Sequence, residues 1–390
     1  MTRQPPELLH MLRELVAIPS VSSVSPDWDQ GNRAVVERLG EWLGDLGFRV
    51  SIQPLPGRAD KANLVATLGE GDGGLVLAGH TDTVPCDAGR WQSDPFTLSE
   101  RDGRLYGLGI CDMKGFLGLV VEAVRGLRVA DLDAPVVVVA TADEESGMAG
   151  ARSLLAEQLG HGRHAVIGEP TGLQPVNVHK GVLMEGVRVT GRSGHSSDPA
   201  LGASALEGMH RVMSDILAWR QQLQSRNVDR RFHVPVPTVN LGHIHGGDNP
   251  NRICGQCDLH IDIRPLPGMR LDDLREVLNQ RLPRVLGETG LSVTLEPLSP
   301  GLPAMETPRD APVVRAAEAL TGMDARAVAF GTEAPYLREL GLDVVVLGPG
   351  NIAQAHQPDE FLASDRLEPT VTLLRGLIQR FCSAKTEASA

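Results

Sequence analysis

The chain has 390 residues, of which 37 are Lys or Arg and 49 are Asp or Glu, so its formal net charge at pH 7 is −12. This acidic balance argues against a partner held by bulk positive charge, such as nucleic acid or an anionic membrane. Hydrophobic residues make up 42% of the chain, which excludes wholesale disorder, and the length predicts two or three domains.

The sequence also lacks the signals of export and of membrane insertion. No stretch approaches about 18 uninterrupted apolar residues, which a membrane-spanning helix would need. The opening MTRQPPELLHMLREL has neither the apolar core nor the cleavage site of a secretory signal. Five cysteines are thinly spread, which fits a reducing compartment better than a disulfide framework. We therefore expect a cytoplasmic protein with no membrane partner.

The amino-terminal half alternates between helical and strand-like patterns. Apolar residues at helical spacing predict helices over 32–46 and 113–127. Short apolar runs, most of them rich in Val, predict strands that are buried on both faces, as in a covered parallel sheet. The runs are 75–78, 135–140, 165–167 and, far downstream, 344–347. Strands interleaved with helices indicate an α/β domain with a mostly parallel sheet.

The middle of the chain has a different pattern. Alternating polar and apolar residues predict three strands, and apolar faces at helical spacing predict two helices. The strands are expected over 183–190, 237–245 and 257–264, and the helices over 203–223 and 271–286. We interpret 182–291 as a small α+β domain inserted into a larger domain formed by 1–181 and 292–390. Further helices are expected over 310–320 and 367–381.

Residues of the types that bind metals follow the four strands of the larger domain. They are His80 and Asp82 after the first strand, Asp143, Glu144 and Glu145 after the second, Glu169 after the third, His356 after the fourth, and Asp112 at the head of the helix over 113–127. In an α/β sheet, ligands bind at the carboxyl edge of the strands. These side chains are therefore expected to converge at one edge.

Each of these residues alone has a structural explanation. His80 could be an ordinary hydrogen-bonded histidine, Asp112 could cap its helix, and Glu144 and Glu145 could form a solvated turn. Their repetition at the same edge of one sheet favours a functional site instead.

Two imidazoles together with several carboxylates suit Zn²⁺, or Co²⁺ and Mn²⁺. Two metal ions need about six protein bonds, which five residues supply if one carboxylate bridges. Asp82 is spaced to hold the second imidazole nitrogen of His80. Of the adjacent Glu144 and Glu145, one is free to transfer a proton while the other binds metal. This combination predicts a metal-dependent hydrolase.

These motifs resemble the zinc-dependent aminoacylase and carboxypeptidase family, whose members have a co-catalytic metal pair. The matching segments are GHTDTVP at 79–85, GLGICDMKG at 107–115, TADEE at 141–145, GEPT at 168–171, SGHS at 193–196, and 348–360. They occur in the family's order along nearly the whole chain.

The resemblance implies a role for each matching residue. One ion, expected to be Zn²⁺ with Co²⁺ as a substitute, would be bound by His80, Asp112 and Glu169, and a second by Asp112, Glu145 and His356. Three residues are implied as catalytic: Glu144 as general base, Asp82 beside His80, and His195, which would reach a neighbouring subunit's site. The substrate-side residues would be Asn251, Arg264, Thr332 and Asn351. The inserted domain is implied to form a homodimer.

Within the family, the chain looks most like members that deacetylate N²-acetyl-L-ornithine in arginine biosynthesis. The stretches that carry this likeness are HKG at 179–181, GHSSDP at 194–199, NRIC at 251–254, DIRPLPG at 262–268 and TEAPY at 332–336. The chain departs from the pattern at Gly331, where we expect Cys. The alternatives are a desuccinylase for succinyl-diaminopimelate, an aminoacylase, a dipeptidase, or a non-catalytic binding protein on the same fold.

Overall fold

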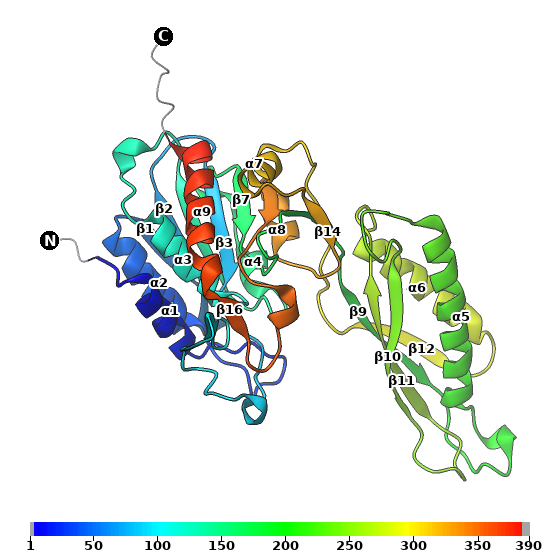
Figure 1. Cartoon of the computed structure of the whole chain (residues 1–390). Coiled ribbons are helices and arrows are strands. Elements are labelled where there is room, and N and C mark those ends of the chain that lie inside the picture. Colours follow the sequence, from blue (N-terminus) through cyan, green and yellow to red (C-terminus); the bar gives the residue numbers. More distant parts are fainter. Residues whose placement is uncertain (1–3, 384–390) are drawn as a thin grey trace. The chain divides into compact units, whose positions relative to one another are not determined.

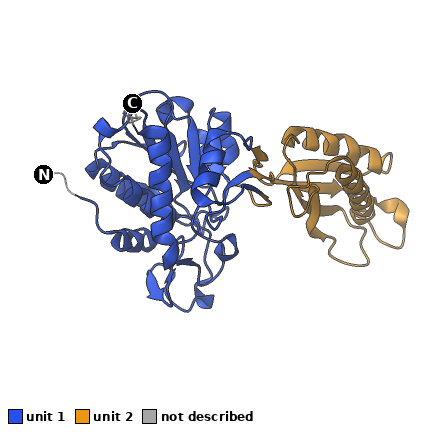
Figure 2. Ribbon diagram, turned by 45° about the horizontal axis from the view of Figure 1, so that its top comes forward, with its two compact units in different colours: residues 1–177, 307–326, 332–390 blue, residues 178–306, 327–331 orange. Residues whose placement is uncertain are grey.

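The computed structural model describes residues 4–383 (Figure 1). The chain divides into two compact units, which Figure 2 colours separately. Unit 1 comprises residues 1–177, 307–326 and 332–390, and unit 2 comprises residues 178–306 and 327–331. The sequence placed the end of the insert at residue 291, whereas the chain remains in unit 2 up to Glu306.

A nine-stranded sheet carries the predicted metal-binding residues of unit 1. Its strand order is β1 (Arg49–Leu55), β2 (Arg58–Leu68), β6 (Val136–Thr141), β3 (Leu75–His80), β7 (His164–Ile167), β15 (Asp343–Val346), β8 (Val176–His179) and β13 (Met305–Glu306), with β14 (Arg326–Val328) also paired to β8. The four central strands β6, β3, β7 and β15 run parallel, whereas the strands that flank them pair antiparallel. The expected α/β fold with a mostly parallel central sheet is confirmed.

The central strands are parallel because helical crossovers connect them and cover the sheet. The long helices of unit 1 are α1 (Leu8–Ala17), α2 (Arg33–Asp45), α3 (Lys114–Val124), α7 (Pro312–Thr321) and α9 (Leu367–Cys382). Their apolar faces share one core with the sheet, and every residue of β3 and β6 is buried. Two short helices are α4 (Ala149–Ser153) and α8 (Ala334–Glu339), and a small sheet contains β4 (Ser99–Arg101), β5 (Arg104–Tyr106) and β16 (Phe361–Ala363).

Unit 2 contains an antiparallel four-stranded sheet and two helices. The strands, in the order β10 (Thr238–Gly246), β11 (Gln256–Arg264), β9 (Leu183–Thr190) and β12 (Ser292–Pro297), pack against α5 (Ala205–Arg226) and α6 (Leu271–Leu286). The sequence predicted three of these strands and missed β12. Because β12 pairs with β9 along its whole length, it extends this sheet beyond the expected boundary at 291. Within residues 4–383, none of the helices combines the length and apolar character needed to span a bilayer.

His179, at the end of β8, makes the stability of the fold depend on pH. Its Nδ1 lies 2.8 Å from the carbonyl oxygen of Lys180, and burial lowers the pKa of His179 to about 4. The unfolded chain protonates this imidazole near pH 6.5, whereas the folded chain does not. The stabilising contribution is therefore complete above pH 6.5 and is lost as the pH falls toward 4.

We expect this histidine to remove roughly 2 kcal/mol of unfolding free energy between pH 7 and pH 5. Urea unfolding of the metal-free protein at both pH values measures the loss, and His179→Gln should reduce it by about that amount. The matched control is His233→Gln, which changes an exposed histidine and should leave the pH dependence unchanged. Equal pH dependence in His179→Gln and the unaltered chain would contradict the assignment.

Candidate active site

The residues expected at the site converge at the carboxyl edge of the parallel strands. His80 is the last residue of β3, Glu144 and Glu145 follow β6, and Glu169 follows β7. Asp112 lies just before α3, where the helix dipole favours a carboxylate. Glycines permit the close approach of these segments. A Cβ on Gly168, for example, would lie 2.1 Å from the ring of Phe116 in α3.

The first group of possible ligands contains His80, Asp112 and Glu169, all of which are buried. The Nε2 atom of His80 lies 3.2 Å from Oδ1 of Asp112 and 3.9 Å from Oε1 of Glu169. One imidazole and two carboxylates in this arrangement form a donor set that suits Zn²⁺.

The second group contains Asp112, Glu145 and His356. The Nε2 atom of His356 lies 3.0 Å from Oε2 of Glu145 and 3.6 Å from Oδ2 of Asp112. The two carboxylate oxygens of Asp112 therefore face different imidazoles, Oδ1 toward His80 and Oδ2 toward His356. This is the arrangement that a carboxylate bridging two metal ions requires.

The electrostatics of the cluster favour bound cations. Loss of hydration raises the pKa of Glu144 well above its usual range, and the nearby carboxylate of Glu169 raises it further. The pKa of Glu169 is raised in the same way, first by burial and then by Asp112. Like charges crowded in a poorly hydrated site repel one another, and divalent cations would offset that repulsion. The donor types and their crowding therefore fit a metal pair.

Asp82 differs in detail from the prediction. The Nδ1 atom of His80 lies 2.9 Å from the backbone carbonyl oxygen of Asp82 and 3.8 Å from its Oδ1, so the carbonyl, not the carboxylate, accepts the hydrogen bond. The carboxylate of Asp82 instead accepts hydrogen bonds from the backbone N–H groups of Glu144, at 3.2 Å, and Glu145, at 3.1 Å. Asp82 thus orients both the imidazole and the turn that carries the two glutamates.

Glu360 is a residue of the site to which the sequence assigned no role. Its side chain is buried, and its Oε1 accepts hydrogen bonds from the backbone N–H groups of Cys111 (2.7 Å) and Asp112 (3.0 Å). Its Oε2 accepts a third from Gly109 at 3.2 Å. Glu360 therefore holds the loop that presents Asp112. The only signal in the sequence was its position in the segment that contains His356.

The remaining predicted residues lie in both units. In unit 1, Thr332 is fully buried and its Oγ1 accepts a hydrogen bond from the N–H of Ala334, whereas Asn351 is exposed. His195, Asn251 and Arg264 lie in unit 2. His195 is hydrogen-bonded to Ser197 through Nδ1 at 2.7 Å. The structure thus brings together the five predicted metal ligands, Glu144 and Asp82 within unit 1, and places these three residues in the other unit.

Arg264 and Gly331 both have neighbours within unit 2. The guanidinium of Arg264 donates to the Asp262 carboxylate, with Nε 3.0 Å from Oδ1. A Cβ at Gly331 would lie 2.3 Å from Cδ2 of Leu302, so the position that departs from the family pattern is packed against this leucine. A larger residue there would require the Leu302 side chain to move.

Some known proteins resemble this chain in sequence, and others resemble it in fold. It is 51% identical to the acetylornithine deacetylase of Edwardsiella ictaluri, over 98% of this chain and 100% of the relative. It is 48% identical to the acetylornithine deacetylase of Pasteurella multocida, over 97% of this chain and 99% of the relative. A solved structure from Bacillus subtilis, described as a dinuclear metal binding peptidase from the M20 family, superposes with a TM-score of 0.67 at 17% identity, covering 95% of this chain and 97% of that one.

The match to a family profile covers the same region as the site. Residues 76–380 match the peptidase family M20/M25/M40, and this range includes every residue of the two ligand groups. The chain therefore belongs to the peptidase family M20/M25/M40.

Proposed function

We propose that this protein is a metal-dependent amidohydrolase that converts N²-acetyl-L-ornithine to acetate and L-ornithine, a step of arginine biosynthesis in the cytoplasm. The observation that carries the proposal is a site with two ligand groups that share Asp112, in a chain about half identical to acetylornithine deacetylases over nearly its whole length.

In this proposal, five side chains hold two divalent ions, Zn²⁺ or Co²⁺. His80, Asp112 and Glu169 would bind one ion, and Asp112, Glu145 and His356 would bind the other. The ligand atoms of each set lie within 4.8 Å of one another, which supports this assignment. Such a metal pair would lower the pKa of a coordinated water toward about 7 and polarise the amide carbonyl.

Glu144 is the proposed general base and acid. It belongs to neither of the two proposed ligand sets, yet one of its carboxylate oxygens lies within 4.8 Å of ligand atoms of His80 and Glu145. In this proposal Glu144 accepts a proton from the attacking water, and the oxygen of that water forms a bond to the acetyl carbon. Glu144 then delivers that proton to the α-nitrogen as the C–N bond breaks, which releases acetate and the free amine.

The other residues are assigned to binding and to stabilisation of the oxyanion. We propose that the protein is a homodimer formed through the inserted domain, 182–291, and that 1–181 with 292–390 is the catalytic domain. The partner subunit's His195 would donate a hydrogen bond to the oxyanion that develops on the acetyl carbonyl oxygen. Asn251, Arg264, Thr332 and Asn351 are assigned to substrate binding.

The substrate assignment is tested with a panel of amides. The chelator-treated full chain is expected to be inactive, and added Zn²⁺ or Co²⁺ should restore hydrolysis. The panel contains N²-acetyl-L-ornithine, N-succinyl-diaminopimelate, N-acetyl-L-methionine and a dipeptide, and kcat/KM should be highest for acetylornithine. A preference for succinyl-diaminopimelate or the dipeptide would overturn the substrate but retain the hydrolytic chemistry. Activity that survives complete removal of the metals would overturn both.

A further inference from the structure

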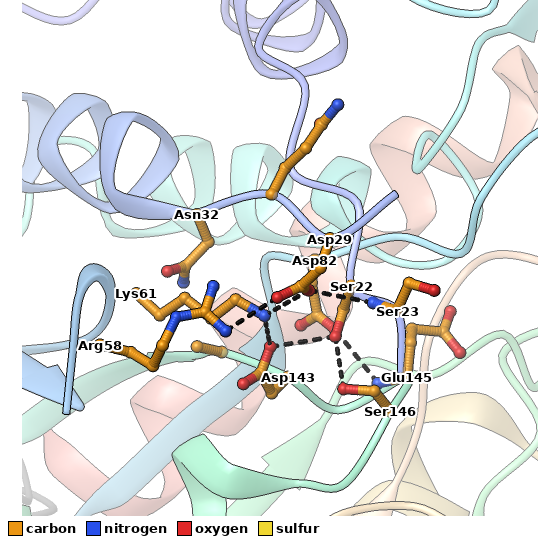
Figure 3. Close-up of polar contacts among 12 residues, drawn as sticks. Ser22, Ser23, Asp29, Asn32, Arg58, Lys61, Asp82, Asp143, Glu145 and Ser146 are labelled. Carbon is orange, nitrogen blue, oxygen red and sulfur yellow. Dashed lines mark hydrogen bonds and ion pairs between the residues drawn. The ribbon is translucent and has the colours of Figure 1, made fainter. Parts of the chain in front are cut away.

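Lys61, in β2, is a buried cation to which the proposed reaction assigns no role. Its side chain is 3% exposed, and its Nζ lies 2.6 Å from Oδ1 of Asp29 and forms an ion pair with the carboxylate of Asp143 (Figure 3). Neither carboxylate belongs to the proposed metal ligands. A buried ion pair loses so much hydration that it adds little net stability, so stability alone does not account for Lys61.

Asp143 begins the turn that carries Glu144 and Glu145. Its φ is +60°, a left-handed conformation that costs free energy for a residue other than Gly. Ser22 contacts the same turn at both ends, because its Oγ donates to Oδ1 of Asp143 at 3.0 Å and lies 2.6 Å from Oγ of Ser146 (Figure 3). Lys61 and Ser22 therefore hold the turn through its side chains, whereas Asp82 holds it through the backbone.

The groups that contact Lys61 are connected, through Ser22 and Ser23, to the segment that follows β3. Asp29 also accepts hydrogen bonds from Arg58 at 2.8 Å and from the N–H of Ser23 at 3.1 Å. The N–H of Ser22 donates to the carbonyl of Thr83 at 2.8 Å. Lys61 thus lies in a continuous polar network that joins the turn at 143–146 to the segment just after β3.

We propose that Lys61 is a positioning residue that acts through Asp143 to place Glu145 for the metal position shared with Asp112 and His356. The inference rests on the ligand groups of the proposed function. Outer partners of metal ligands typically change metal affinity by about 10–100-fold when they are removed. Lys61 contacts the turn that carries Glu145, but it does not contact the segment that carries Glu169. The loss of metal affinity should therefore be confined to one of the two positions.

The direction of the change separates positioning from simple electrostatics. An ammonium group near a cation site repels the cation, so its removal would by charge alone strengthen metal binding. Loss of positioning has the opposite effect, because the Glu145 carboxylate would no longer be held in place. Lys61→Met is therefore expected to weaken metal binding at the second position and to leave binding by His80, Asp112 and Glu169 unchanged.

The test is calorimetric titration of Zn²⁺ into the chelator-treated full chain, which resolves the two binding steps without substrate. For Lys61→Met we expect one of the two binding steps to lose about 10–100-fold in affinity and the other to stay unchanged. The matched control is Arg58→Met, which removes a cation from the same Asp29 but does not contact Asp143, and should bind both ions as the unaltered chain does. In an Asp143→Asn background, Lys61→Met should have no further effect on affinity.

For Lys61→Met, the proposal would be overturned by unchanged or tighter binding, by an equal loss at both positions, or by an effect that adds to that of Asp143→Asn. Removal of Lys61 leaves two partly buried carboxylates without the ammonium group between them, so Ser22→Ala provides a milder variant if that protein does not fold. It removes two hydrogen bonds to the same turn without unpairing a charge, and it should also weaken only the second position. Unchanged affinity in Ser22→Ala would contradict the inference. A wrong substrate assignment would leave these titrations unaffected.

Discussion

Glu144→Gln is expected to retain both metal ions and to lose turnover, with kcat reduced by about 10²–10⁴-fold. Glutamine has nearly the same shape as glutamate but accepts no proton at neutral pH. The proposed ligand groups, His80 with Asp112 and Glu169 and His356 with Asp112 and Glu145, do not require Glu144. Metal content measured by elemental analysis should therefore match that of the unaltered chain.

The matched control for this variant is Glu157→Gln, which changes an exposed glutamate in the same unit and should keep full activity. If Glu144→Gln retains more than a few per cent of the rate, the base is misassigned. If it loses metal instead, Glu144 is a ligand, as the third group of neighbouring donors, His80 with Glu144 and Glu145, would permit.

His195→Ala is expected to reduce kcat by about 10²–10³-fold, the usual effect of removing one donor to an oxyanion. Metal content and KM should change much less, because the proposed hydrogen bond strengthens only as charge develops on the carbonyl oxygen. Steady-state kinetics with acetylornithine, at matched metal loading, measures the separation of kcat from KM. A loss confined to KM would make His195 a residue of substrate binding.

A mixture of two inactive variants tests whether His195 acts across subunits. In a dimer of His195→Ala with Glu144→Gln, one site would combine an intact Glu144 with the partner's His195. Random exchange of equal amounts would place half the chains in such dimers, so the mixture should recover about a quarter of the original activity. If His195 acted within its own chain, both sites would be defective and no activity would return.

The two residues changed in these variants lie in different units. Glu144 lies in unit 1 with the metal ligands, whereas His195 lies in unit 2, in a loop where its Nδ1 is already hydrogen-bonded to Ser197. That bond leaves Nε2 as the nitrogen available to donate to a substrate oxygen. Variants of Ser197 would therefore be expected to affect the orientation of His195 rather than the metal pair.

The sequence by itself determined the central sheet and the identity of the clustered residues. Continuous Val-rich runs predict strands buried on both faces, and β3, β6 and the buried residues of β7 and β15 agree with this. Because the carboxyl ends of parallel strands meet at one edge, the positions of His80, Glu145 and Glu169 after three such strands were enough to predict that they converge.

The strands that the sequence missed have weaker local patterns. β2 begins with the exposed or partly exposed residues Arg58, Ala59 and Asp60, and then buries polar Lys61, Asn63 and Thr67 among its apolar side chains. β12 alternates between partly and fully exposed residues at the edge of its sheet. Propensity and periodicity are local measures, whereas these strands form because a partner strand is already present.

Only the tertiary structure decided which atoms of the site contact one another. The hydrogen bond of His80 to the Asp82 carbonyl, the three N–H groups on Glu360 and the ion pairs of Lys61 join atoms through a particular backbone geometry. Glu360 lies 248 residues from Asp112 along the chain, and Lys61 lies 82 residues from Asp143. Residue spacing carries no information about such contacts, because the packing of the whole unit determines which side chains meet and which oxygen each donor reaches.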